Sequence, residues 1–259
     1  MQVKNSYYWF EKALSPEVCE KIIKYGCEKI EKEKNEGRDV SATTIGYNHK
    51  QGLEAEGIKA QPRGDKTAEE AKTELGISGA DIEKAQYIRD SEVTWMSDQW
   101  LYDLVYPFLH RANKDAEWNY EFGSSETFQF TKYGPGQFYG WHSDGGSCHG
   151  SKYKRAIPGV TPKTNGMYPK GYTDNPDMVN KIRKLSTTIN LNVEGEYEGG
   201  NLKFDFGPHS AGKRYHECVE IRPQGSMIVF PSYTYHQVTP VTKGTRYSLV
   251  LWTLGKPFQ

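Results

Sequence analysis

Turn residues divide the second half of the sequence so regularly that few folds can accommodate it. From Ser124 onward, short segments rich in β-branched and aromatic residues are separated by turn residues about every 8–12 positions. Candidate strands span residues 125–133, 137–142, 184–192, 201–206, 214–222, 226–230, 233–241 and 245–254. A jelly roll winds such strands into two facing sheets and covers their edges. We therefore predict a double-stranded β-helix; a sandwich of the same strands without a site is the alternative.

The first half of the sequence predicts helical support for this core. Ser15, as N-cap, precedes Pro16 at the first helical position and an apolar series with helical spacing. We expect a helix of about four turns there. A second apolar stripe predicts an amphipathic helix over residues 97–109. The fold class is therefore mainly β with flanking helices (α+β).

Three further stretches complete the N-terminal half. Residues 7–14 and 86–96 have strand character. Residues 31–85 are polar and rich in Glu, Lys and Gly, which predicts a long excursion with one short helix, or a disordered loop. We expect one domain over residues 1–259, in which 1–123 support a core formed by 124–254.

Charge and cysteine content restrict the partners and the compartment. The chain has 33 basic and 33 acidic residues, so neither nucleic acid nor an acidic membrane surface is an expected partner. No apolar run approaches the ~20 residues of a membrane span, and the N-terminus has no uninterrupted apolar region typical of a secretory signal. The four cysteines lack zinc-site spacing and are interpreted as reduced thiols. We expect a cytoplasmic protein.

One segment interrupts the rhythm of strands. Residues 145–183 contain four prolines, many glycines and the tyrosines Tyr153, Tyr168 and Tyr172. A loop of this length within a compact domain is usually functional or disordered. Because it begins directly after Asp144, a lid or substrate-binding loop is favoured over a passive insertion.

The residues with the clearest chemistry are His142, Asp144 and His236. Two histidines and one carboxylate on a rigid β scaffold form the ligand set of a non-haem iron(II) oxygenase, which leaves coordination positions open. Arg246 and Ser248 follow on the next predicted strand, with both side chains on one face. An arginine inside a barrel is costly unless an anion meets it, and the distal carboxylate of a dicarboxylate would supply that anion.

The full pattern, His142-x-Asp144 … His236 … Arg246-x-Ser248, resembles that of the 2-oxoglutarate- and iron(II)-dependent oxygenases, and within them the prolyl 4-hydroxylase-like branch. The resemblance covers residues 86–254. Further motifs that carry it are YGPG (133–136), Tyr139-x-x-His142, LSTTINLN (185–192), EGGNL (198–202), HQVTP (236–240) and GTR (244–246).

The resemblance implies roles for individual residues. His142, Asp144 and His236 become the iron ligands, and Arg246 anchors the 5-carboxylate of 2-oxoglutarate. Tyr133 becomes a phenol that lines the cosubstrate pocket. Asn190 stands where some relatives have a tyrosine that also reaches this carboxylate, so Ser248 is the candidate to replace that contact. The structural alternatives are packed or surface histidines, a turn aspartate and a strand-end salt bridge.

Two other residues near the pattern have open interpretations. Tyr139 is expected to pack inside the barrel. Arg89, on the strand that leads to Trp95, either faces the substrate or forms a structural pair at the sheet edge.

The resemblance also implies an activity. Fe(II) is the cofactor, 2-oxoglutarate and O2 are cosubstrates, and ascorbate is an additional candidate cofactor. The expected reaction converts 2-oxoglutarate and O2 to succinate and CO2 while a C–H bond is hydroxylated, with a prolyl residue in a peptide or protein as the expected substrate. The alternatives are a hydroxylase of a free amino acid, another small molecule or a nucleobase, and a non-enzymatic jelly-roll binding module. The oligomeric state stays open.

Overall fold

A computed structural model describes residues 5–47, 85–145, 152–163, 168, 171–207 and 214–258. The elements of the first half are β1 (Tyr8–Phe10), α1 (Pro16–Asn35), β2 (Ser41–Tyr47), β3 (Ala85–Met96), α5 (Gln99–Asp115), β4 (Ser124–Ser125), β5 (Phe128–Tyr133) and β6 (Phe138–His142). Those of the second half are β7 (Lys154–Arg155), β8 (Tyr172–Thr173), β9 (Ile182–Asn190), β10 (Tyr197–Gly199), β11 (Leu202–Asp205), β12 (Tyr215–Glu217), η2 (Val219–Ile221), β13 (Met227–Pro231), β14 (Tyr235–Val238), β15 (Val241–Gly244) and β16 (Arg246–Gly255).

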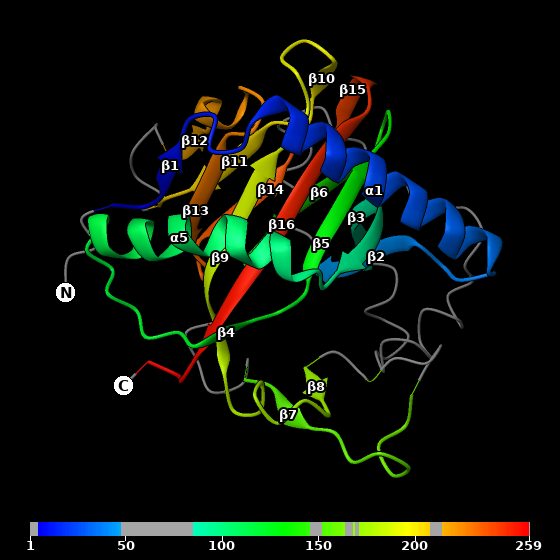
Figure 1. Cartoon of the computed structure of the whole chain (residues 1–259), viewed down its shortest axis with the longest axis vertical. Coiled ribbons are helices and arrows are strands. Elements are labelled where there is room, and N and C mark those ends of the chain that lie inside the picture. The colour runs from blue at the N-terminus through cyan, green and yellow to red at the C-terminus, as the bar shows by residue number, and fades with distance from the viewer. Residues whose placement is uncertain are drawn as a thin grey trace.

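One twelve-stranded antiparallel sheet curls round to form the body of the protein (Figure 1). Its main path runs β1-β13-β9-β16-β5-β3-β6-β14-β11-β12, with β2 joined to β3 and β4 to β16. Strand β3 pairs with β5 through its C-terminal half and with β6 through its N-terminal half, so it joins the two halves of the curl. The separate pairs β10-β15 and β7-β8 complete the strands. The predicted double-stranded β-helix is confirmed.

Helix α1 begins where the capping residues predict. The Ser15 side chain accepts a hydrogen bond from the Val18 backbone N–H, and Pro16 occupies the first turn. The helix continues to Asn35, beyond the predicted four turns, and its buried residues include Ile22, Gly26 and Ile30. Because these positions repeat at helical spacing, they present one apolar stripe to the sheet.

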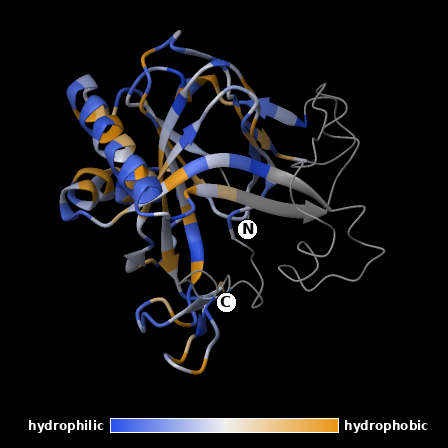
Figure 2. Cartoon of the chain, turned by 90° about the vertical axis from the view of Figure 1, so that its right-hand side faces the viewer, coloured by the Kyte–Doolittle hydropathy of each residue, from blue (hydrophilic) through white to orange (hydrophobic). Residues whose placement is uncertain are grey.

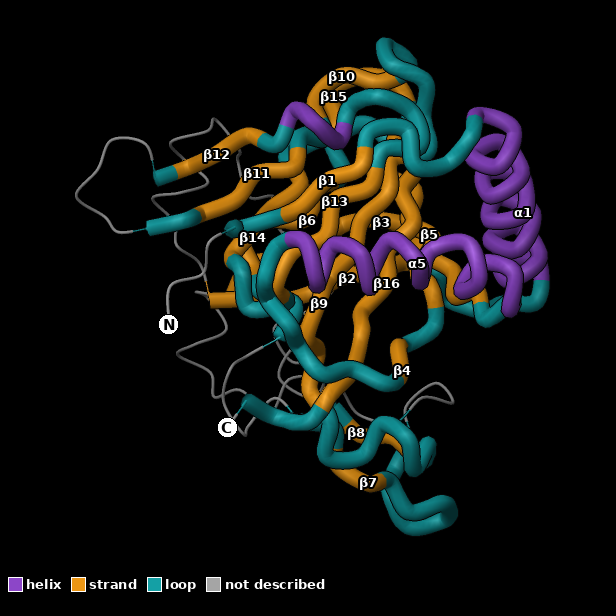
Figure 3. The backbone as a smooth tube through the Cα atoms, turned by 60° about the vertical axis from the view of Figure 1, so that its left-hand side comes forward, coloured by secondary structure: helices purple, strands orange, loops and turns teal. Residues whose placement is uncertain are grey.

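Helix α5 lies beside α1 on the same side of the large sheet (Figure 3). It runs past the predicted end at residue 109, because Leu109 and Ala112 continue the buried stripe that Leu101 and Val105 begin. Pro107 is accommodated within the helix. Residues of both helices share one core with β5, β9, β13 and β16. Figure 2, coloured by hydropathy, shows polar and apolar residues alternating along the helices, as expected when one stripe packs against a sheet.

The packing of Gly26 of α1 against the sheet predicts a stability effect. A Cβ atom at Gly26 would lie 2.5 Å from the ring of Phe130, which is fully buried on β5. We expect Gly26→Ala to be destabilising, because overpacking of a core costs ~1–3 kcal/mol while the gain in helix propensity is at most ~1 kcal/mol. Chemical denaturation would measure the difference. Gly123→Ala is the matched control, because a Cβ there meets no atom within 4 Å and the φ angle is ordinary. Equal stability of the two variants would contradict the prediction.

Several predicted boundaries were wrong. The first strand stops at Phe10 because the chain turns at Lys12, whose φ is 51°. The predicted strand 214–222 ends at Glu217, and a 3-10 turn follows, which buries Ile221 in a small second core. Strand β2 lies within the polar stretch predicted to be an excursion; among the described strands it pairs with β3 alone, off the main path of the sheet. The predicted excursion over residues 48–84 lies outside the described residues.

Two further observations concern the cysteines and the helices. The described cysteines, Cys19, Cys27 and Cys218, are free thiols, as predicted. Among the described residues, neither helix combines the length and the apolar character that crossing a bilayer requires.

Candidate active site

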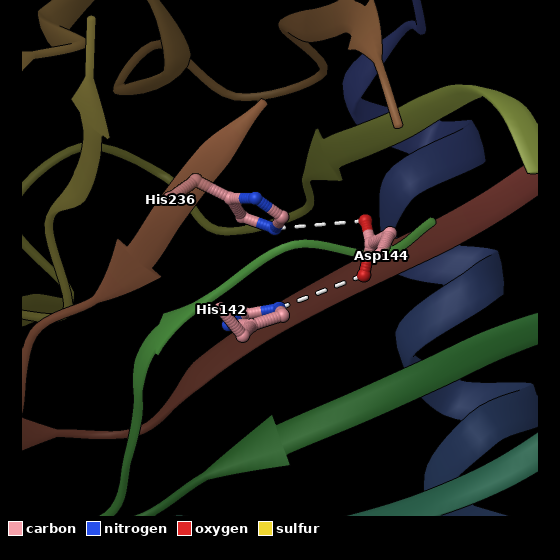
Figure 4. A group of neighbouring side chains, drawn as sticks. All are labelled: His142, Asp144 and His236. Carbon is pink, nitrogen blue, oxygen red and sulfur yellow. Dashed lines mark ion pairs between the residues drawn. The ribbon is translucent and has the colours of Figure 1, made fainter. Parts of the chain in front are cut away.

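Two neighbouring strands carry the histidines of the predicted metal site. His142 on β6 and His236 on β14 stand directly opposite each other in the antiparallel ladder, and their ring centroids are 4.2 Å apart. Asp144 follows β6 by two residues, and its carboxylate faces both rings from one side, with one oxygen toward each imidazole (Figure 4). Its Oδ1 is 3.5 Å from Nε2 of His142, and its Oδ2 is 3.5 Å from Nε2 of His236. One ligand atom from each residue lies within 4.8 Å of the others, the only such group among the described residues.

Backbone carbonyls orient both imidazoles toward this point. Nδ1 of His142 is 2.7 Å from the Gly140 carbonyl oxygen, and Nδ1 of His236 is 2.9 Å from that of Thr234. Because a carbonyl only accepts, each Nδ1 carries the proton and each Nε2 presents its lone pair. A backbone partner on the far nitrogen is the usual support of a metal-binding histidine.

Burial and charge favour a cation among these three groups. Their side chains are 9%, 6% and 8% exposed for His142, Asp144 and His236. Burial, together with a smaller effect of the nearby His142, lowers the pKa of His236 to about 4, so this imidazole is neutral at pH 7. Burial alone would raise the pKa of Asp144, but His236 and His142 together hold it below its usual range. Neutral nitrogen ligands with one carboxylate suit a divalent transition metal such as Fe²⁺.

The depressed pKa of His236 predicts how the metal-free protein responds to acid. Between pH 6.5 and about 4 the unfolded chain binds a proton at this residue that the folded chain refuses. The free energy of unfolding should therefore fall as the pH drops through this window, by at most ~1.4 kcal/mol per pH unit. Urea denaturation at several pH values measures it. His236→Gln should flatten this part of the profile, and an unchanged slope would count against the assignment.

Arg246, the first residue of β16, brings a buried positive charge into the same interior. Its side chain is 1% exposed, and Nη1 donates a 3.2 Å hydrogen bond to Oγ of Ser248. The guanidinium carbon lies 5.5 Å from the centroid of the Tyr133 ring. Within the described part of the chain, Nε has no hydrogen-bond partner and no carboxylate pairs with the guanidinium. A buried, unneutralised arginine indicates a site for an anion.

Glycine makes room for this arginine. A Cβ at Gly200 would lie 2.8 Å from Cδ of Arg246, and the φ of Gly200 is +57°. Gly200 is the second residue of the Gly199-Gly200 pair at the end of β10. The second glycine also shapes the place where the arginine side chain lies.

All six predicted site residues line one cavity. They come from strands β5, β6, β14 and β16 and from the turn after β6, and they are Tyr133, His142, Asp144, His236, Arg246 and Ser248. His236 and Arg246, which come from two different strands, thus border the same interior. Their individual roles stay predictions.

Asn190 does not line this cavity. Its side-chain Nδ2 donates to the carbonyl oxygens of Asn192 and Arg222, at 3.1 and 2.8 Å, and its Oδ1 accepts from the Asn192 N–H. The amide is therefore occupied by the backbone. This leaves Ser248 as the hydroxyl beside Arg246, in line with the sequence argument.

A β-bulge brings one more aromatic residue to the metal centre. The ladder between β6 and β14 pairs His142 with His236 but Tyr139 with Val238, so β6 contains one extra residue. In a regular strand, residues three apart face opposite sides, whereas the bulge lets Tyr139 and His142 share one side. Their rings stack with centroids 3.5 Å apart and planes 11° apart. Tyr139 thus packs, as expected, but it packs on a candidate ligand and lines the cavity.

Arg89 adopts neither expected arrangement in full. Its guanidinium carbon lies 4.6 Å from the centroid of Tyr139, and its Nε donates to Oγ of Ser91. It is 7% exposed and is not among the residues that line the cavity. We interpret Arg89 as support for the Tyr139 ring.

The sequence argument missed several lining residues. Continuing the alternation of β16 beyond Arg246 and Ser248 leads to Val250 and Trp252, which both face the cavity. Trp252 is 4% exposed, and its indole Nε1 has no hydrogen-bond partner among the described residues. The strands that flank β16 add four polar residues, namely Gln129, Ser186, Thr187 and Thr188. Period-2 counting could have identified Trp252; the polar residues carried no motif.

The segment 145–183 is described only in part. Its described residues include the short parallel pair β7 and β8, at the end of the molecule opposite the β10-β15 pair (Figure 1). Tyr172 and Val160 are exposed there. That this segment acts as a lid stays a prediction.

Comparison with known proteins supports the sequence pattern. Residues 128–254 match the family model described as the 2OG-Fe(II) oxygenase superfamily. Over 82 residues the chain is 40% identical to a PKHD-type hydroxylase of Synechococcus sp. (strain CC9605). This alignment covers 31% of this chain and 34% of that protein. Over 123 residues it is 32% identical to a PKHD-type hydroxylase of Janthinobacterium sp. (strain Marseille). This second alignment covers 48% of this chain and 41% of that protein. The chain thus spans about a third to two fifths of these relatives' length.

One solved structure shows the same fold. The viral collagen prolyl hydroxylase of Paramecium bursaria Chlorella virus-1, in its complex with 2OG, aligns with a TM-score of 0.52. The alignment covers 97% of both chains at 17% sequence identity.

Proposed function

Because its residues 128–254 place this chain in the 2OG-Fe(II) oxygenase superfamily, we propose that it is an Fe(II)- and 2-oxoglutarate-dependent hydroxylase that acts on a prolyl residue of a peptide or protein. One observation carries the proposal. A two-histidine, one-aspartate group and a buried arginine without a counter-ion line the same cavity.

The residues present fit the metal that the family uses. Two Nε2 lone pairs and one ionised carboxylate converge on one point, and the far nitrogen of each imidazole is already occupied by a carbonyl. His142, Asp144 and His236 would hold Fe(II). Bound there, it would activate O2 at the expense of 2-oxoglutarate, which leaves as succinate and CO2.

The chain's own residues bind and orient the cosubstrate. Arg246 offers a planar fork of N–H donors to the 5-carboxylate, and Ser248 fixes one arm of that fork. The Tyr133 ring, beside the guanidinium, covers the same end of the cavity. With its 5-carboxylate held there, the 2-oxo acid end of the cosubstrate can extend toward the histidines. The buried walls exclude water from the reacting groups.

The prime substrate is assigned from the relatives and from the rest of the lining. The similar proteins named above are two PKHD-type hydroxylases and a collagen prolyl hydroxylase. In this chain, the lining of the cavity also includes the aromatic residues Tyr139, Phe230 and Trp252. Aromatic walls suit the apolar, rigid ring of proline, and the Trp252 N–H can donate to a peptide carbonyl.

We further propose that residues 1–259 form one oxygenase domain in which 1–123 support 124–254. Ile22 of α1, Leu101 of α5, and Phe130 and Leu249 of the sheet belong to one hydrophobic core. Removing the helices would expose that core to water.

Product analysis with defined substrates tests the function. The Fe(II)-loaded protein is incubated with 2-oxoglutarate, O2 and a panel of proline-containing peptides, each matched by a peptide with alanine in place of proline. We expect succinate release to rise with the proline peptides alone, and their mass to increase by one oxygen atom. Free proline, other amino acids and a single-stranded oligonucleotide are parallel arms. Turnover with one of these instead would move the assignment to a different substrate. No succinate in any arm would contradict the proposed chemistry.

A further inference from the structure

Arg183, where the segment 145–183 returns to the sheet, ties three parts of the chain together. Its Nε and Nη2 donate to the two carboxylate oxygens of Glu126, at 2.5 and 2.7 Å. Its Nη1 donates to the backbone carbonyl of Asp144, at 3.3 Å. The guanidinium also lies 4.0 Å from the centroid of Trp252. A forked ion pair of this kind is directional, so the position of Glu126 determines where the third nitrogen points.

The segment contributes a third member to this ion pair. The hydroxyl of Tyr153 donates a 2.7 Å hydrogen bond to Oε1 of Glu126, the oxygen that also accepts from Nε of Arg183. Glu126 is 8% exposed, so little water is available to replace the phenol. We call Glu126, Arg183 and Tyr153 the carboxylate bridge.

Backbone hydrogen bonds close the segment at the same place. The N–H of Tyr153 donates to the Lys181 carbonyl, and the Tyr153 carbonyl accepts from the N–H of Asn180, both at 2.9 Å. The ammonium of Lys181 donates to Oγ of Ser124. These hydrogen bonds hold the two ends of the segment together at Tyr153, Asn180 and Lys181, and we call these three residues the neck. Tyr153 is the residue of the neck that contacts Glu126.

The chain just after Asp144 is packed against the same arginine. A Cβ at Gly145 would lie 3.0 Å from Cβ of Arg183 and 3.3 Å from Cβ of Ser232. The N–H of Gly145 donates to the Ser232 carbonyl at 2.8 Å. The main chain of Asp144 is thus fixed by Arg183 through its carbonyl and by close packing one residue later.

We infer that Tyr153 is a positioning residue for the metal centre. By completing the hydrogen bonds of Glu126, it holds Arg183, and Arg183 holds the main chain of Asp144. The segment 145–183 thereby acts on the candidate ligand through its neck. This inference rests on the proposed metal site, and it assigns to the segment a role that a substrate-covering lid does not require.

Metal titration of the metal-free protein tests the inference without turnover. Co(II) is the probe, because its visible absorption bands report the ligand geometry as well as the binding. Tyr153→Phe removes only the hydroxyl, and we expect the affinity for Co(II) to fall about tenfold and the bands to shift, since losing a group that orients a ligand typically costs about 10–100-fold in metal affinity. Tyr172→Phe is the matched control, a half-exposed tyrosine of the same segment that lies beside Lys154.

A second variant shows whether the effect passes through the carboxylate. Glu126→Gln should weaken Co(II) binding at least as much as Tyr153→Phe. The double variant should add little to Glu126→Gln alone, because both changes interrupt one chain of contacts. If Tyr153→Phe were too unstable to titrate, unchanged Co(II) affinity and unchanged bands in Glu126→Gln would still overturn the inference, because the carboxylate through which Tyr153 acts would then have no effect on the ligand.

The outcomes separate this inference from the proposed function. If the parent protein does not bind Co(II), the metal site itself is refuted. If the parent binds and Tyr153→Phe has the same affinity and the same bands, the positioning role is overturned while the metal site stands. A lower melting temperature with unchanged bands and affinity also overturns it, because the tyrosine would then only stabilise the fold.

Discussion

Alanine in place of His236 is expected to abolish metal binding and succinate formation together. The substitution removes one of three ligand groups from a point where the described residues offer no replacement, and it leaves the Asp144 carboxylate facing only His142. The neighbours of His236 are Phe230, whose ring lies edge-on to the imidazole, and Val238, which offers no donor atom. A two-ligand remainder would bind Fe(II) too weakly to survive dialysis.

The measurement pairs metal content with activity. Anaerobic titration with Fe(II) or Co(II) gives the affinity, and succinate formation gives the turnover. His110→Gln is the control, because this histidine is exposed on α5, where its ring stacks on Phe122. Turnover at the parent rate in His236→Ala would refute the ligand assignment. Retained metal binding with lost turnover would mean that the metal binds elsewhere.

Arg246→Ala is expected to raise the Michaelis constant for 2-oxoglutarate roughly ten- to hundredfold or more, because a hydrogen bond to a charged group contributes ~1.5–3 kcal/mol. Metal affinity should change far less, since the guanidinium is not one of the candidate ligands. Arg246→Lys should restore only part of the loss, because an ammonium offers a point charge without the fork.

Two controls make this experiment specific. Ser248→Ala removes the hydroxyl that accepts from Nη1, and it should raise the same constant by a smaller factor. Asn190→Ala should act on stability instead, because the Asn190 amide bonds only to backbone atoms and stays outside the cavity. An unchanged constant in Arg246→Ala would mean that the 5-carboxylate is held by another group.

Much of the fold followed from local sequence signals. Ser15 and Pro16 marked the start of α1, and strand periodicity located β5, β6, β9 and β16 to within a few residues. Helix ends were less predictable, because the length of α5 depends on the sheet surface against which Leu109 and Ala112 pack. Strand β2 could not be recognised, since an edge strand of polar residues has no hydrophobic alternation.

The candidate site was predictable where a chemical motif marked it. Histidine, aspartate and arginine in a fixed order identified His142, Asp144, His236 and Arg246 as one group. The bulge beside Tyr139 and the Glu126–Arg183 ion pair carried no such mark. Both depend on which strands become neighbours, and Glu126 and Arg183 are 57 residues apart in the sequence.

The opposed histidines of β6 and β14 have one more consequence. A slip of one residue between these strands would turn one imidazole to the outer surface, because side chains alternate with period two. A metal ion would therefore bind through both histidines only when the two strands are in the correct register, and it would cross-link them there. During refolding, the ion would stabilise the molecules in which the two strands have the correct register. The yield of folded protein should therefore depend on whether the metal is present before the strands pair or is added only afterwards.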